Sequence, residues 1–296
     1  MDQGHGKDPG AVPRVRGEVP GEEERSEEPF EDAFARIEAA VRAGRSDLGR
    51  LGFWRLLGRI KPDPELTDRW ADVAGRIDAT VFDRAVPWRF PVWLGNAALV
   101  LGIGVGAAAG VVAVRSEEDA VAGAGLIVAA GAWSVSVHGL SHWAVGRAAG
   151  IRFASYFFRP GQLPPRPGIK TDYATYLRAD PRARARMHAA GALATKLAPF
   201  AALALYPASK APAWAGWIVL VMGVGQIATD VLFSRTTGDW SRVLRERRVA
   251  RERAVLLGSL DARAQTAERE ASRDDPGPRP ATDRLPPEPG SSGQPG

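Results

Sequence analysis

The chain has 296 residues, of which 45% are hydrophobic and 25% are charged, and its formal net charge at neutral pH is +5. It contains no cysteine, which excludes disulfide bridges, thiolate metal sites and a cysteine nucleophile. Any metal site must therefore use histidine, aspartate or glutamate side chains. These averages are typical of soluble proteins, but the charges are distributed very unevenly along the chain.

Residues 1–28 are charged and rich in proline and glycine, so we expect a disordered N-terminal tail. Residues 29–86 are predicted to form amphipathic helices that are cytoplasmic or lie at the membrane interface. Their apolar side chains recur at helical spacing: Phe30, Phe34, Ile37 and Val41, then Leu66, Trp70, Val73, Ile77 and Val81. The stretch LGRLGFWRLLGRIK within this region fits a helix on an anionic membrane surface and a helix packed on its neighbours equally well.

Four apolar segments follow, at about residues 91–114, 120–146, 187–209 and 211–233. Each has about the 20 residues that a membrane-spanning helix needs, and each carries at most one charged residue. A buried helix of a soluble protein is rarely that long without more charges. We therefore predict that residues 87–240 form a four-span membrane domain surrounded by the lipid bilayer.

The lysines and arginines of the loops indicate the orientation of these segments. Basic residues precede the first segment, are frequent in residues 147–186 and follow the fourth segment, whereas the other two loops contain few. This pattern predicts a protein integral to the cell membrane with both termini in the cytoplasm. Because the positive charge reports topology, we expect no nucleic-acid partner. Residues 241–270 are predicted to form a charged cytoplasmic helix, and residues 271–296 a second disordered tail.

The second apolar segment ends with the sequence VSVHGLSHWAVGR, which contains His138 and His142. Residues four positions apart lie on one face of a helix, and zinc-binding helices present two imidazoles with this spacing. Asp230 lies at a similar depth in the fourth segment, and His188 opens the third segment on the same side. A polar cluster that only ties helices together would contain the same residues, so both interpretations stay open.

The run HGLSHWAVGRAAGIRF resembles the first motif of the site-2 protease family of intramembrane zinc metalloproteases. Two further stretches match in the expected order. Residues 188–196, HAAGALATK, are similar to the family's AGPxxN helix, and residues 238–245, GDWSRVLR, are similar to its LDGGRVLR-like motif. The resemblance covers about residues 120–245. It implies an all-α four-span helical bundle with a short β-hairpin-like insertion between spans two and three, where IRFASYFF and KTDYATYL fit two short strands around a proline-rich turn.

The resemblance implies a zinc site whose ligands are His138, His142 and Asp239. Asp239 can meet the histidines only if the fourth segment is interrupted near residues 234–238, whereas helical depth alone favours Asp230 as the third ligand. Two other side chains are expected beside the metal, and these are His188 and Lys196. Lys196 could also pair with Asp230.

One departure from the family changes the expected chemistry. Gly139 stands where the family has the glutamate of HExxH, the base that activates zinc-bound water, and glycine cannot take a proton. No glutamate occurs between Glu118 and Glu246. The resemblance therefore implies a degenerate, non-proteolytic member that keeps a metal or uses the former site to hold a membrane-protein partner.

Two alternatives stay open. One is an active, divergent metallopeptidase in which Asp230 replaces the missing base. The other is a membrane scaffold or lipid-binding protein in which the histidines and aspartates form a purely structural cluster.

Overall fold

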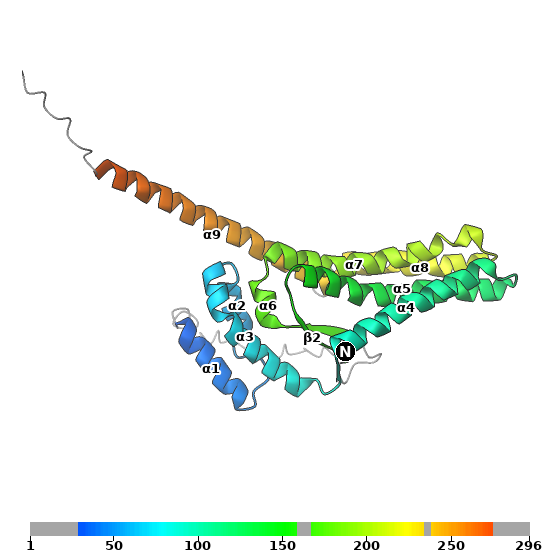
Figure 1. The fold of residues 1–296 in the computed structure, drawn as a ribbon, viewed down its shortest axis with the longest axis horizontal. Coiled ribbons are helices and arrows are strands. Elements are labelled where there is room, and N and C mark those ends of the chain that lie inside the picture. Colours follow the sequence, from blue (N-terminus) through cyan, green and yellow to red (C-terminus); the bar gives the residue numbers. More distant parts are fainter. Residues whose placement is uncertain (1–28, 159–166, 234–237, 275–296) are drawn as a thin grey trace, which may run out of the picture.

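The computed structural model describes residues 29–158, 167–233 and 238–274, and this part of the chain is mostly helical (Figure 1). Its elements are α1 (Phe30–Arg42), α2 (Phe53–Ile60), α3 (Pro64–Ala85), β1 (Arg89–Phe90), α4 (Val92–Arg115), α5 (Asp119–Ala148), β2 (Phe153–Phe158), β3 (Pro167–Thr171), α6 (Tyr173–Arg178), α7 (Pro181–Leu203), η2 (Tyr206–Ala208), α8 (Ala213–Phe233) and α9 (Gly238–Asp274). The predicted N-terminal tail, the proline-rich turn and most of the predicted C-terminal tail lie outside the described residues.

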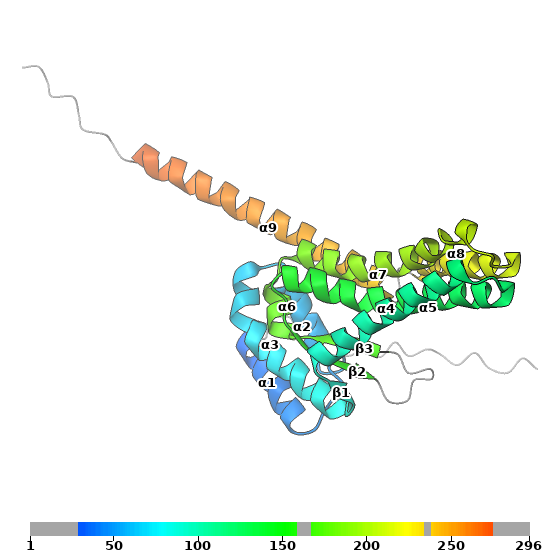
Figure 2. The ribbon, with the colours of Figure 1, turned by 45° about the vertical axis from the view of Figure 1, so that its right-hand side comes forward.

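Helices α4, α5, α7 and α8 pack side by side in one bundle, and all four are long and apolar enough to cross a membrane (Figure 2). In the most apolar stretch of each helix fewer than half of the residues are buried, from 17% in α4 to 44% in α5. The large apolar surface that remains exposed suggests a membrane environment. Helix α7 begins six residues before the predicted span because the Asp180 carboxylate caps it and Pro181 occupies its first turn.

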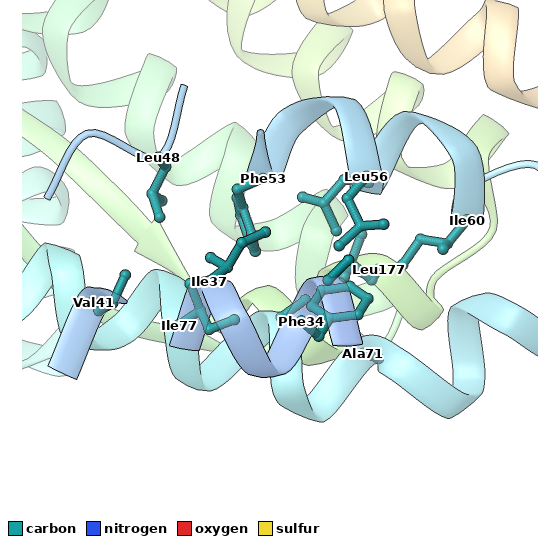
Figure 3. Packing of buried hydrophobic residues seen from close by; sticks show 13 residues of the cluster. Phe34, Ile37, Val41, Leu48, Phe53, Leu56, Ile60, Ala71, Ile77 and Leu177 are labelled. Atoms are coloured by element: carbon teal, nitrogen blue, oxygen red, sulfur yellow. The ribbon is translucent and has the colours of Figure 1, made fainter. Parts of the chain in front are cut away.

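The N-terminal helices α1, α2 and α3 form a separate small core together with α6 (Figure 3). The cluster includes Phe34 and Ile37 of α1, Phe53 and Leu57 of α2, and Leu177 of α6. The apolar side of α2 is therefore occupied by protein. Of the two interpretations of LGRLGFWRLLGRIK, this packing agrees with the helix that packs on its neighbours.

A three-stranded antiparallel sheet lies between the N-terminal helices and the bundle, in the strand order β1-β2-β3. Strands β2 and β3, which lie between α5 and α7 in the sequence, pair with each other. Strand β1, which precedes α4 in the sequence, pairs with β2 through Arg89 and Phe90. The sequence KTDYATYL, expected to be a strand, is mostly helix α6. The reason is Asp172, whose side chain accepts hydrogen bonds from the backbone N–H groups of Ala174 and Thr175 and so starts a helix.

Helix α9 begins at Gly238, after a gap of four residues in the described chain that follows the end of α8 at Phe233. Gly238 has a φ of +80°, a left-handed conformation that glycine adopts without strain. The first part of α9 packs against α7, and the rest extends away from the bundle (Figure 1). Every residue from 257 to 270 is exposed, and the helix continues four residues beyond the start of the predicted tail.

The N-terminal core generates a stability prediction. The Leu57 side chain is only 1% exposed, so Leu57→Ala should leave a cavity and lower the free energy of unfolding by about 2–5 kcal/mol. The control is Arg55→Ala on the exposed side of the same helix, which should change it by less than about 0.5 kcal/mol. Denaturant unfolding of the protein in detergent, followed by circular dichroism, measures both. Equal stability of the two variants would contradict this core.

Candidate functional site

Three side chains that the sequence singles out converge at one end of the bundle. His138 and His142 lie on α5, and Asp239 lies in the first turn of α9. The Nε2 atom of His142 lies 3.1 Å from Oδ2 of Asp239, and Nε2 of His138 lies 3.6 Å from the same oxygen. One ligand atom from each residue lies within 4.8 Å of the other two, so this group could hold a metal ion.

The other nitrogen of each imidazole is bound to helix α7. Nδ1 of His142 lies 2.8 Å from the backbone carbonyl oxygen of Met187. Nδ1 of His138 lies 3.2 Å from the carbonyl oxygen of Gly191 and 2.7 Å from the hydroxyl of Thr195. Thr195 donates its own proton to the Gly191 carbonyl, so it accepts from the histidine. A carbonyl oxygen can only accept, and both histidines must therefore carry a proton on Nδ1.

This protonation leaves the two Nε2 atoms as lone-pair acceptors when the imidazoles are neutral, and both face a carboxylate. Burial raises the pKa of the Asp239 carboxyl, but the hydrogen bond and charge of His142, with contributions from His138 and Arg242, outweigh it and hold the pKa at about 2. Asp239 is thus ionised at neutral pH. When His142 is protonated, its Nε2–H donates to Oδ2 of Asp239 at 3.1 Å. When both imidazoles are neutral, three acceptor atoms meet at this point, and a shared cation would stabilise them.

Glycines make room for this arrangement. A Cβ atom at Gly191 would lie 2.2 Å from Nε2 of His142, so only glycine lets the imidazole lie against α7. A Cβ atom at Gly139 would meet a methyl group of Leu99 at 2.8 Å and would lie 3.7 Å from the hydroxyl of Tyr156. Position 139 therefore points toward α4 and β2, on the wall of the pocket that the histidines line.

The pocket has a volume of about 1130 Å³ and lies where the bundle meets the other parts of the protein. The residues that line it come from several elements and include Leu99 of α4, Val135 of α5, Trp54 of α2, Tyr156 of β2 and Arg242 of α9. The candidate metal ligands are therefore accessible from a chamber that is partly apolar and partly charged.

A buried charge cluster lies next to the three ligands. Glu246 of α9 is 2% exposed; its Oε1 accepts from Nζ of Lys61 and from the hydroxyl of Tyr176, both at 3.1 Å. Its Oε2 lies 2.8 Å from Nε of Arg184, whose side chain is fully buried. Burial raises the pKa of Glu246, but the charges of Lys61 and Arg184 outweigh it, so the net shift is downward. The same hydroxyl of Tyr176 lies 3.1 Å from Nε2 of His188.

Sequence reasoning did not find this cluster. Lys61 and Glu246 are separated by 185 residues, and nothing in either local sequence indicates the pairing. One signal was present: Asp239 and Glu246 are seven residues apart and therefore lie on one face of α9. A buried glutamate does lie near the histidines, but its Oε1 accepts two hydrogen bonds and its Oε2 forms an ion pair with Arg184.

The other expected residues fall in two places. His188 lies beside the three ligands, with Nδ1 at 3.9 Å from Oδ1 of Asp239. Lys196 and Asp230 pair with each other, and Nζ of Lys196 also donates to the carbonyl oxygen of Ala192. Among the described residues, Asp239 and not Asp230 belongs to the group that could hold a metal. The segment 234–237, where the helix break was expected, lies outside the described residues.

Comparison of the chain with protein-family models, with curated proteins and with solved structures gave no match. Any assignment of function therefore depends on the motifs and the geometry described above.

The close approach at Gly191 leads to a prediction. Gly191→Ala should displace the His142 imidazole and lower zinc affinity at least about tenfold, because a metal site tolerates little movement of its ligands. The matched control is Gly131→Ala on α5, where an added Cβ meets nothing within 4 Å. Zinc titration of the detergent-purified variants against a competing chelator measures the change. Unaltered affinity in Gly191→Ala would show that His142 is not held against this glycine.

The charge cluster leads to a second prediction. Glu246→Gln leaves Lys61 and Arg184 buried without a counter-charge, and should lower the free energy of unfolding by about 3–5 kcal/mol. The control Glu252→Gln removes an exposed carboxylate from the same helix and should cost less than about 0.5 kcal/mol. Denaturant unfolding compares the two. A loss in Glu246→Gln no larger than in the control would contradict a buried cluster.

Proposed function

We propose that this protein is a membrane protein with a site-2 protease-like core that binds one zinc ion through His138, His142 and Asp239 and does not cleave peptides. The observation that carries the proposal is the convergence of two imidazole Nε2 atoms and an ionised carboxylate, with both Nδ1 protons donated to α7. Zinc takes histidine nitrogens and carboxylate oxygens together, and its histidine ligands typically donate the other N–H to a carbonyl or carboxylate.

The loss of the family's glutamate supports the non-proteolytic part of the proposal. Bound zinc would supply an acidic water, but a base must still take its proton during attack on a peptide. Gly139 occupies the family's base position, and Glu246 is already bound by Lys61, Tyr176 and Arg184. Asp230, the alternative base, is paired with Lys196. Loss of a general base costs about 10²–10⁴ in rate.

The membrane context of the site agrees with the same proposal. His142 lies near the C-terminal end of α5 and His188 near the N-terminal end of α7, so the site lies close to one end of the apolar bundle. The distribution of arginine and lysine between the loops supports a cytoplasmic position for that end and for both termini. A core that binds metal and does not hydrolyse peptides could bind a membrane-protein partner in the pocket without cleaving it.

Metal content tests the proposal. Full-length protein purified in lipid nanodiscs should contain about one zinc ion per chain by elemental analysis, and His142→Ala or Asp239→Asn should lose nearly all of it because three ligands define the site. Asp230→Asn should keep its zinc. Zinc-free wild-type protein would favour a structural polar cluster, and zinc loss in Asp230→Asn with retention in Asp239→Asn would favour the other carboxylate.

Proteolysis is tested separately with a membrane-helix reporter. The zinc-loaded wild-type protein should leave the reporter intact. Cleavage by the wild type that disappears in Asp230→Asn would overturn the non-proteolytic proposal in favour of an active, divergent metallopeptidase.

A further inference from the structure

A third imidazole beside the proposed metal site has a buried nitrogen without a partner. The His188 side chain is 8% exposed, and its Nδ1 makes no hydrogen bond within the described part of the chain. This nitrogen lies 3.9 Å from Oδ1 of Asp239. The other ring nitrogen, Nε2, lies 3.1 Å from the hydroxyl of Tyr176.

The hydrogen-bond directions show which nitrogen of His188 carries the proton. Glu246 is held ionised by two cations and can only accept, so the single hydroxyl proton of Tyr176 is donated to its Oε1. The Tyr176 oxygen is then left to accept from Nε2–H of His188. A neutral imidazole has one N–H, so Nδ1 carries a lone pair and faces the carboxylate of Asp239.

A buried lone pair facing an anionic oxygen is unfavourable unless a cation lies between them. At His138 and His142 the Nδ1 protons are also donated away from Asp239, and their Nε2 atoms face its other oxygen, Oδ2. Three imidazoles on two helices thus turn a ring nitrogen toward one carboxylate on a third helix. Nε2 of His142 is within hydrogen-bond distance of Oδ2, whereas Nδ1 of His188 has no partner in the described part of the chain, and a cation bound by the same carboxylate would give it one.

We propose that Nδ1 of His188 is the fourth protein ligand of the metal held by His138, His142 and Asp239, which makes the site a closed one. This inference rests on the proposed zinc binding. The 3.9 Å between His188 and Asp239 is measured to Oδ1, whereas the other two histidines face Oδ2, and the ligand atoms that already lie within 4.8 Å of one another are those of His138, His142 and Asp239. Coordination by His188 therefore requires its imidazole to move closer to these three atoms. Helices α7 and α9 are already in contact.

A closed site has a chemical consequence that agrees with the rest of the pocket. Structural zinc sites have four protein ligands, whereas catalytic sites have three and leave one position for water. With His188 in the fourth position no water would be bound, and a base at position 139 would have nothing to activate. Gly139 and a His188 ligand therefore agree with the same role, in which the metal links helices and does not activate water.

Zinc-edge X-ray absorption of the zinc-loaded, full-length protein tests the ligand count without any substitution. We expect scattering from three imidazoles and one carboxylate oxygen, with bond lengths of about 2.0–2.2 Å. Two imidazoles and a bound water would overturn the inference and leave the proposed zinc site standing. Zinc-free wild-type protein would instead overturn both.

Cobalt substitution provides the matched test with variants. The visible spectrum of the cobalt-loaded wild type should not respond to azide, because no coordination position is open. His188→Gly should respond to azide, bind zinc at least about tenfold more weakly, and recover the wild-type spectrum when imidazole is added. An azide response in the wild type, or a His188→Gly spectrum identical to that of the wild type, would exclude His188 as a ligand.

Discussion

The arrangement of the site depends on hydrogen bonds that point away from it. The carbonyl oxygens of Met187 and Gly191 accept the Nδ1 protons of His142 and His138, and this fixes which nitrogens face Asp239. Both carbonyl groups belong to helix α7. Gly191 has no side chain and so leaves room for the His142 imidazole, and Thr195 donates to the Gly191 carbonyl. In an apolar bundle these donors have few alternatives, because lipid supplies no hydrogen-bond partners.

Helix α9 brings Asp239 to the histidines, and a second interaction on the same face holds that helix. Glu246 lies seven residues further along and is bound by Lys61 from the end of α2 and by Arg184 from α7. Arg253 adds a hydrogen bond of 2.9 Å to the backbone carbonyl of Lys61. The N-terminal helices therefore fix the register of α9, so a part of the chain that contributes none of the three candidate ligands still determines where the Asp239 carboxylate lies.

Local patterns were sufficient to predict the four apolar helices, the HxxxH pair and, through the motif, Asp239. What they missed depends on contacts between distant segments. Strand β1 has two residues and exists because Arg89 and Phe90 pair with Phe157 and Tyr156. The pairing of Glu246 with Lys61 joins positions 185 residues apart. The tautomers of the histidines depend on backbone carbonyls, which no pattern of side chains reveals.

Helix α8 ends at Phe233 and α9 begins at Gly238, and α9 is attached to the bundle mainly by the contacts of its first turns. Two of those contacts are carboxylates, and they differ in one respect. Glu246 is neutralised by Lys61 and Arg184, whereas Asp239 has Arg242 of its own helix at 3.5 Å and the imidazoles of His142 and His138 at 3.1 and 3.6 Å. A metal ion bound by the histidines of α5 would add a positive charge next to the Asp239 carboxylate. It would then join the projecting helix to the bundle, a structural role that agrees with the proposed non-proteolytic function.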